Sequence, residues 1–507
     1  MMHSIGTSRF WQGDLTSARW PPMVKYVPRN LVAESGVFRM AKEIVEAATR
    51  ELVSALGEAK VLSKRADLIP YAKDTYRIRF DEEYRYVPDL VVFPETTAEV
   101  QNIVRVAAVH KIPLIPKGGG SNRTGMLVPI HGGIVVDTIK MNKVVEVSVP
   151  NLYVTAQPGI TLKELDKALE PYGLVLTQEQ GSYKVATVGG SISTAGFSRK
   201  HQKYGTISDR IMSLEVVLAN GEVLRTGPKI LYTSTGYRLS QLFVGAEGTL
   251  GIITEATLRV EPVPEARRVL LAFYDDFWKA NDVALRVMGT PVTFVGGEAY
   301  GIDEATQIGA PPGKEGLFYL AFEGTREEVE AQVAYVKAII EETGGIIASE
   351  DAASKFIDRY TSQWCGARAI TGFEDALTTY VPVEKMREFY DRLWNQIMPK
   401  YDTRNVPGEK YSLDVGRYRI MAGRFKIPTG EHGWEGYQRA LREIAELATG
   451  LGGSISSCHG VGIEHRDNLD LEYSEVALDA MRAIKRALDP DNIMNPGKKI
   501  PAKRGAR

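Results

Sequence analysis

The stretch Ile112–Gly125 reads IPLIPKGGGSNRTG, a short apolar run followed at once by three consecutive glycines and a Ser-Asn pair. Glycines let backbone N–H groups approach an anion closely, and they also tolerate positive φ angles. The spacing is that of neither a P-loop nor the GxGxxG dinucleotide fingerprint. Taken alone, the stretch fits either a phosphate-binding loop or a flexible turn.

The residues before the glycines predict a βαβ unit. The segment DLVVFPETTAEVQNIVRVAAVHKIPLIPKGGG contains a strand, a proline, a helix capped by threonine and a second strand over Ile112–Ile115. The glycine run therefore lies at the carboxyl end of the second strand. Ligands of open α/β sheets bind at that end, which favours the phosphate-binding interpretation.

Working outward, the pattern predicts a mixed α+β fold. Apolar residues return at helical spacing over Phe38–Leu56, and Gly57 stands where that helix would end. A compact amphipathic helix is expected over residues 161–173, after several short β-rich runs. Asn220-Gly221 between two apolar runs predicts a β-hairpin. Strands and helices alternate too irregularly for a uniform doubly wound sheet.

Composition narrows the classes of partner and compartment. The 507 residues carry a net charge of −1, which gives no general reason to expect nucleic acid as a partner. Cys365 and Cys458 are the only cysteines, so we expect a reducing, cytoplasmic setting without disulfides. The N-terminus lacks the apolar core of a signal peptide, and no segment is apolar enough to span a bilayer. Peripheral membrane contact stays open.

Four glycine-rich stretches occur in order along the chain: PKGGGSN, VATVGGSISTAG, KYGTISDRIMSLEVVLANGEVLRTG and LFVGAEGTLGIITEATLRV. In this order and spacing they resemble the FAD-binding domain of the vanillyl-alcohol oxidase superfamily, also called the p-cresol methylhydroxylase (PCMH) type. The resemblance is to its branch of 2-hydroxyacid dehydrogenases and alkylglycerone-phosphate synthases. The later motifs GGSISSCHGVGIEHR and LDPDNIMNPGK extend it to nearly the whole chain.

The resemblance implies a fold and a domain division. It implies an FAD-binding domain of two α+β subdomains and an α+β cap domain with an antiparallel sheet. Two prolines near residue 264 mark the boundary between them. We expect an N-terminal helical segment over 1–87, the FAD domain over 88–264, a substrate-binding cap over 265–450, and a segment over 451–507 that returns to the FAD domain.

The resemblance also assigns cofactor contacts to the glycine-rich stretches, although each stretch alone would also fit a tight turn or a sheet edge. The first is implied to wrap the FAD pyrophosphate with Pro116, Lys117, Gly118, Gly119, Gly120, Ser121 and Asn122. The others are implied to contact FAD through Thr187, Gly189, Gly190, Ser193, Thr194, Gly196, Tyr204, Gly205, Glu247, Gly251, Ile252 and Ile253. Asn495 is implied to bond the flavin ring. The first loop offers no His or Cys, and His201 lacks a diagnostic context, so we expect dissociable FAD.

Two His-Gly strings compete for the role of catalytic base. Oxidation of an alcohol by a flavin needs a group that accepts the hydroxyl proton, and histidine suits this task. His432 precedes a predicted helix and lies too far from NPGK. His459 follows LGGSIS and stands at the expected distance from NPGK, so we assign the base to His459. The family usually has Glu before this His, whereas this chain has Cys458, which we interpret as a packed residue.

The family's histidine-rich metal motif on a cap strand has no counterpart here. The corresponding segment, YSLDVGRYRIMAGRFKIP, contains no histidine, so no metal site is expected. Its arginines Arg417, Arg419 and Arg424 suggest instead an anionic substrate, because a guanidinium binds a carboxylate or phosphate bidentately. A basic solvent-facing strand is the competing interpretation. Tyr418 is a candidate acid/base group, with simple packing as its alternative.

Several functions remain in competition at this point. The first is FAD-dependent oxidation of a small 2-hydroxy acid of the D-lactate or glycolate type. The second is an alkylglycerone-phosphate-synthase-like transfer without net redox change, and the third is metal-free oxidation of a phenol or other alcohol. A flavin-binding module in an electron-transfer complex is the non-enzymatic alternative. We expect a homo-oligomer, whereas the sequence names no electron acceptor.

Overall fold

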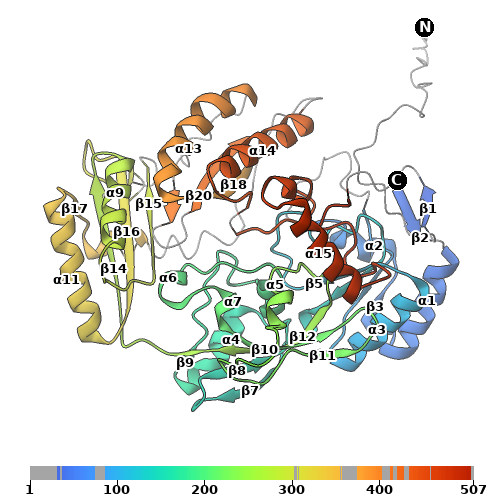
Figure 1. Cartoon of the computed structure of the whole chain (residues 1–507). Coiled ribbons are helices and arrows are strands. Elements are labelled where there is room, and N and C mark those ends of the chain that lie inside the picture. The colour runs from blue at the N-terminus through green and yellow to red at the C-terminus, as the bar shows by residue number, and fades with distance from the viewer. Residues whose placement is uncertain are drawn as a thin grey trace, which may run out of the picture.

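The computed structural model describes two sheet-rich bodies and a C-terminal segment (Figure 1). The described residues are 31–34, 37–40, 42–74, 86–301, 305–306, 308–353, 355–356, 374–401, 412–414, 420–426, 433–456 and 458–503. The predicted α+β class with an antiparallel cap sheet is confirmed. Among these residues no helix is long and apolar enough to cross a membrane.

The first sheet contains the predicted βαβ unit. Its order is β3-β4-β6-β5, and β4, β6 and β5 run parallel. The strands are β3 (Val61–Leu62), β4 (Leu90–Val92), β6 (Ile134–Asp137) and β5 (Leu114–Lys117). Helix α3 (Thr97–His110) crosses between β4 and β5, and the Thr96 hydroxyl accepts from the Glu99 amide at 3.2 Å. The glycine run follows β5 directly, as the sequence predicted.

Two predicted element boundaries were wrong. The helix expected from Phe38 begins at Lys42, as α1 (Lys42–Leu56), because Phe38 lies in β2 (Val37–Met40). That strand pairs with β1 (Leu31–Glu34), a pairing that helical periodicity does not reveal. The strand expected over Ile112–Ile115 is shifted by two residues toward the C-terminus, and its pairing with β6 fixes this register.

The second sheet is five-stranded and antiparallel, in the order β11-β10-β12-β8-β7. Its strands are β11 (Val223–Arg225), β10 (Ile211–Val217), β12 (Ile252–Arg259), β8 (Tyr153–Ala156) and β7 (Val144–Ser148). The predicted hairpin at Asn220-Gly221 is confirmed, with Gly221 at φ 80°. Beside this sheet β9 (Leu174–Val175) pairs with β13 (Glu261–Pro262).

Short helices join the strands of the second sheet and hold the glycine-rich loops. Helix α4 (Leu162–Leu169) begins with a capping box in which Thr161 and Glu164 bond reciprocally, in agreement with the predicted amphipathic helix. The remaining helices are α5 (Val188–Ser193), α6 (His201–Tyr204), α7 (Ile207–Arg210) and α8 (Ser240–Phe243).

The third sheet is seven-stranded, and all its pairs are antiparallel, in the order β17-β14-β16-β15-β19-β20-β18. The strands are β17 (Ile346–Ile347), β14 (Ala266–Tyr274), β16 (Gly316–Gly324), β15 (Gly296–Tyr300), β19 (Ser412–Asp414), β20 (Ile420–Lys426) and β18 (Glu374–Tyr380). Helices α9 (Phe277–Met288), α11 (Arg326–Glu342), α13 (Met386–Arg392) and α14 (Gly433–Gly450) accompany this sheet (Figure 1).

The C-terminal segment packs against the first sheet. Helix α15 (Glu475–Leu488) ends at Asp489, whose carboxylate accepts from the amides of Ile493 and Met494 at 3.0 and 2.8 Å. The turn that follows then exchanges backbone bonds with Leu114 of β5: its amide donates to Ile493 at 2.7 Å, and its carbonyl accepts from Asn495 at 2.8 Å. The last part of the chain is thereby fixed beside the glycine run.

We predict that Met494→Ala lowers the free energy of unfolding by about 2–5 kcal/mol, because Met494 is fully buried in the core of the first sheet. Urea unfolding followed by fluorescence measures this loss. Val476→Ala on the exposed face of α15 is the control, since Val476 is 80% exposed, and it should change stability by less than about 0.5 kcal/mol. Equal losses in both variants would contradict the packing described for Met494.

Candidate functional site

The first two glycine-rich stretches touch so closely that side chains are excluded between them. A Cβ on Gly118 would lie 2.3 Å from the Thr187 hydroxyl, and one on Gly119 would lie 1.8 Å from the carbonyl oxygen of Val185. Gly120 has φ 73°, a conformation that favours glycine. The glycines of the first stretch are therefore required for the approach of two backbones, whatever ligand the loop binds.

The second stretch forms α5 and uses its hydroxyls locally. A Cβ on Gly189 would lie 2.5 Å from that of Pro158, so this position also needs glycine. The Thr187 hydroxyl accepts from the Gly190 amide at 3.3 Å, and the Thr194 hydroxyl donates to the Gly190 carbonyl at 3.0 Å. Both threonines thus hold the shape of the loop.

The polar side chains of the first stretch are also engaged. Lys117 donates to the buried carboxylate of Asp137 at 2.8 Å. Its charge is therefore neutralised within the protein, whereas the sequence left open whether it meets the cofactor or solvent. Asn122 accepts from the Thr124 amide at 3.1 Å and shapes the turn after the glycines. Ser121 is exposed.

The fourth stretch joins the first two at Glu247. The Glu247 amide donates to the Ser193 carbonyl at 2.8 Å, which ties it to α5. The next residue, Gly248, has φ 70° and would place a Cβ 3.0 Å from the Pro116 ring. Three of the four predicted stretches therefore meet at one place, which we call the cradle.

The other residues of the second and fourth stretches that were predicted to contact the cofactor lie against or within the protein core. A Cβ on Gly196 would lie 1.8 Å from the Gln180 side-chain nitrogen, so this glycine also serves a close approach. Gly251 precedes β12. The side chains of Ile252 and Ile253, at the start of that strand, are buried in the cores of the first and second sheets respectively. Only the backbone of these isoleucines is available to a cofactor.

Glu247 connects the cradle to the loop that carries His459. Its carboxylate, in a residue only 4% exposed, accepts from the Val461 amide at 2.8 Å and from the Gly462 amide at 2.9 Å. Lys499 lies 3.5 Å from one of its oxygens. Since Val461 is two residues after His459, these bonds anchor the loop that carries the proposed base to Glu247. The sequence indicated Glu247 only as a cofactor contact.

Asn495 lines the same place from the C-terminal segment. Its buried side-chain nitrogen donates to the carbonyls of Met126 and Glu247 at 3.1 and 2.8 Å. Its oxygen has no hydrogen-bond partner among the described residues. A buried acceptor without a donor costs free energy unless a ligand supplies one, and the isoalloxazine ring of FAD carries such an N–H group. The cradle and this acceptor together fit FAD.

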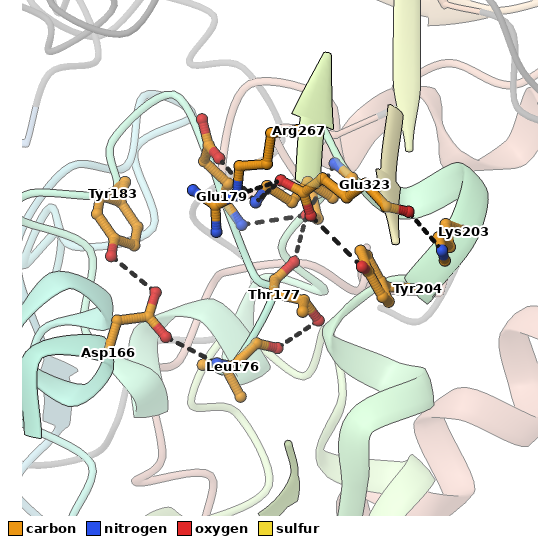
Figure 2. Close-up of polar contacts among 11 residues, drawn as sticks. Asp166, Leu176, Thr177, Glu179, Tyr183, Lys203, Tyr204, Arg267 and Glu323 are labelled. Atoms are coloured by element: carbon orange, nitrogen blue, oxygen red, sulfur yellow. Dashed lines mark hydrogen bonds and ion pairs between the residues drawn. The ribbon is translucent and has the colours of Figure 1, made fainter. Parts of the chain in front are cut away.

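The third stretch contacts the seven-stranded sheet, which we call the cap sheet. The Tyr204 hydroxyl points to Glu323 of β16, at 3.4 Å (Figure 2). Burial, followed by the charge of Glu323, raises the pKa of Tyr204, which stays a hydrogen-bond donor. Gly205 has φ 76°, and a Cβ there would collide with Asp209. Contact of Tyr204 and Gly205 with FAD stays a prediction.

Titratable groups with shifted pKa values lie on segments that adjoin the predicted stretches, and the sequence indicated few of them. Lys498 is buried and donates to the Val128 carbonyl at 2.6 Å; burial lowers its pKa to about 7. Burial, helped by the charges of Lys498 and Arg466, lowers the pKa of His131 to about 4. His201 is likewise buried and has a pKa lowered to about 4 by burial. NPGK, which contains Lys498, is a sequence signal for one of these groups, and the sequence raised His201 only as a possible point of covalent FAD attachment.

The segment predicted to bind the substrate, residues 411–428, is described only in part, and we call it the substrate arm. Arg417, Tyr418, Arg419 and His432 lie outside the described residues. Arg424 lies in β20, where its backbone is in register with Ala376 of β18. In the part of the chain that the structure describes, no group of three or more His, Cys, Asp or Glu side chains could hold a metal ion.

Comparisons with known proteins give the family context. Residues 88–227 match the model of the FAD binding domain, and residues 263–499 match the C-terminal domain of FAD linked oxidases. The glycolate oxidase subunit GlcD of Bacillus subtilis is 31% identical, over 82% of this chain and 90% of its own. D-lactate dehydrogenase of Archaeoglobus fulgidus is 32% identical, over 87% and 98%.

Solved structures with lower identity share the fold. A p-cresol methylhydroxylase has a TM-score of 0.74 at 21% identity, over 92% of this chain and 98% of its own. An alkyldihydroxyacetonephosphate synthase has a TM-score of 0.73 at 19% identity, over 92% and 89%. The comparisons support FAD as the cofactor of the cradle.

We predict that Gly119→Ala weakens FAD binding by about five- to a hundredfold, because its Cβ must displace the Val185 carbonyl, and such overpacking costs on the order of 1–3 kcal/mol. FAD content after gel filtration and a fluorescence titration measure the change. Gly436→Ala on α14 is the matched control, since a Cβ there meets no atom within 4 Å. Equal FAD affinity in the two variants would show that the cradle does not need its glycine.

Proposed function

We propose that this chain, which belongs to the family of FAD-linked oxidases, oxidises a small 2-hydroxy acid of the D-lactate or glycolate type. The anchoring of the His459 loop to Glu247 at the cradle carries the proposal. It supports His459 as a proton acceptor close to the predicted cofactor site. The hydroxy-acid specificity of the relatives named above supports the substrate class.

The proposed mechanism divides the work between cofactor and chain. FAD, when bound, accepts a hydride from the substrate carbon. The backbone of the cradle would hold the pyrophosphate, and the side-chain oxygen of Asn495 would accept a hydrogen bond from an N–H group of the ring. His459 accepts the proton of the substrate hydroxyl through a ring nitrogen. The bonds from Glu247 to the residues after His459 limit the movement of this loop.

Arginine side chains are proposed to hold the substrate carboxylate. A planar guanidinium offers two parallel N–H donors to a carboxylate. Arg424 belongs to the cap sheet, and we propose that Arg417 and Arg419 contribute with it. The absence of histidine from YSLDVGRYRIMAGRFKIP supports recognition by charge without a metal. Tyr418 is proposed as an auxiliary acid/base group.

The transferase alternative draws on Cys458, which stands where the dehydrogenases usually have glutamate. The relatives with about 30% identity favour the dehydrogenase.

We further propose a cytoplasmic homo-oligomer with dissociable FAD, which light scattering and cell fractionation test. The start of β14 at Ala266 supports a cap domain over 265–450, and the pairing of the C-terminal turn with β5 supports the return of 451–507 to an FAD domain over 88–264.

We predict that anaerobic mixing with D-lactate or glycolate bleaches the flavin absorbance of the holoenzyme. The panel also contains the L-enantiomers, longer 2-hydroxy acids, simple and phenolic alcohols, and acyl-dihydroxyacetone phosphate. Bleaching by a 2-hydroxy acid is the expected result. If no 2-hydroxy acid reduces the flavin while a phenol or the acyl phosphate changes its spectrum, the proposal is wrong.

His459→Ala should slow substrate-dependent reduction by at least about a hundredfold while FAD stays bound, because loss of a general base typically costs that factor. Stopped-flow absorbance under anaerobic conditions measures the rate. His110→Ala on α3 is the matched control; His110 pairs with Glu51 on the surface at 2.9 Å and should leave the rate unchanged. A normal rate in His459→Ala would remove His459 from the mechanism.

A further inference from the structure

A short segment connects the cofactor stretches to the cap sheet. We call Ser198–Gly205 the strap; it follows the second predicted cofactor stretch and includes the first residues of the third, Lys203–Gly205. Its Gln202 amide donates to the Val295 carbonyl at 3.3 Å, just before β15. A Cβ on Gly296 of β15 would lie 1.9 Å from the Arg199 carbonyl oxygen, so the two backbones are in direct contact.

Glu323 of β16 is the main polar anchor of the strap on the cap (Figure 2). Its carboxylate accepts from Lys200 at 2.7 Å and from the Tyr204 hydroxyl at 3.4 Å. Arg267 of the neighbouring strand β14 lies 3.2 Å from the same carboxylate, and Lys203 donates to the Glu323 carbonyl at 2.6 Å. Glu323 is only 7% exposed, and removal of its charge leaves Lys200 with the more distant carboxylate of Glu179, at 3.7 Å, as its ion-pair partner.

The strap is also hydrogen-bonded to the loop that follows β9, beside the second sheet. The buried hydroxyl of Ser198 donates to the Thr177 carbonyl at 3.2 Å and accepts from the Glu179 amide at 3.1 Å. The Arg199 amide donates to the Glu179 carbonyl at 2.8 Å. The strap therefore bonds to both bodies of the molecule.

A buried carboxylate fixes the segment to which the strap bonds. Asp166 of α4 accepts from the Leu176 amide and from the Tyr183 hydroxyl, each at 2.7 Å (Figure 2). Burial raises the pKa of Asp166, and burial followed by the charge of Asp166 raises the pKa of Tyr183. The loop to which the strap bonds is thus held by Asp166 of α4, independently of the cap sheet.

We propose that Glu323 is a positioning residue that couples FAD binding to the placement of the cap sheet. The strap follows the second predicted cofactor stretch, which belongs to the cradle, so a change in the position of the strap reaches the cradle through that stretch. On the cap side, β16 belongs to the same sheet as β20, which carries Arg424. Loss of the anchor therefore loosens the cradle and misplaces the substrate arm. The substrate half of this inference rests on the proposed function, whereas the cofactor half does not.

The test compares Glu323→Gln with Glu330→Gln. Glu330 is the matched control, because it pairs with Arg268 of the same strand β14 at 3.2 Å but at an exposed position. For Glu323→Gln we expect FAD affinity to fall about tenfold, the scale of one charged hydrogen bond, and KM to rise with kcat within twofold. Glu330→Gln should match the wild type. Unchanged FAD affinity in Glu323→Gln overturns the coupling.

A double-mutant cycle separates coupling from general destabilisation. Lys200→Met alone should also weaken FAD binding, and in the Glu323→Gln background it should add little, because both changes remove one interaction. Additive losses overturn the assignment. If Glu323→Gln does not fold, Glu323→Asp keeps the charge and takes its place in the cycle. The FAD titration uses no substrate, so it holds or fails separately from hydroxy-acid oxidation.

Discussion

The buried carboxylate of Glu247 is the interaction on which the rest of the site depends. It accepts from two consecutive backbone amides, those of Val461 and Gly462, while its own backbone bonds Ser193 and Asn495. A carboxylate taken out of water is stable only when donors replace its hydration, and charge-assisted bonds to N–H groups do this well. One residue thereby joins the cofactor cradle to the loop of the proposed base.

This constraint explains why residues far apart in the sequence form one site. The chain leaves the cradle after β12, builds the seven-stranded sheet, and returns through α14 and α15 (Figure 1). Backbone pairing of the final turn with Leu114 and the bonds of Glu247 fix the return. The strap links the intervening sheet to the cradle from the other side. The C-terminal turn, the loop that carries His459 and the seven-stranded sheet are therefore attached to the cofactor-binding part by three separate polar connections.

The parts of this arrangement that follow local rules were predictable. The βαβ unit, the hairpin at Asn220-Gly221 and the capped helix α4 each depend on residues close in sequence. The residue at which α1 begins was not predictable in this way, because the pairing of β2 with β1 takes residues such as Phe38 out of the helix. The meeting of three glycine-rich stretches followed from family resemblance. Periodicity and spacing did not indicate the bonds from Glu247 to residues more than two hundred positions later.

Amide hydrogen exchange at Val461 and Gly462 in Glu247→Gln measures whether the Glu247 carboxylate holds the loop that carries His459. The variant amide can accept one bond but presents N–H groups to the second donor. Loss of a hydrogen bond to a charged group costs about 1.5–3 kcal/mol, so we expect exchange about ten- to a hundredfold faster at both amides than in the wild type. Unchanged protection at both positions would contradict the claim that Glu247 holds the His459 loop against the cradle.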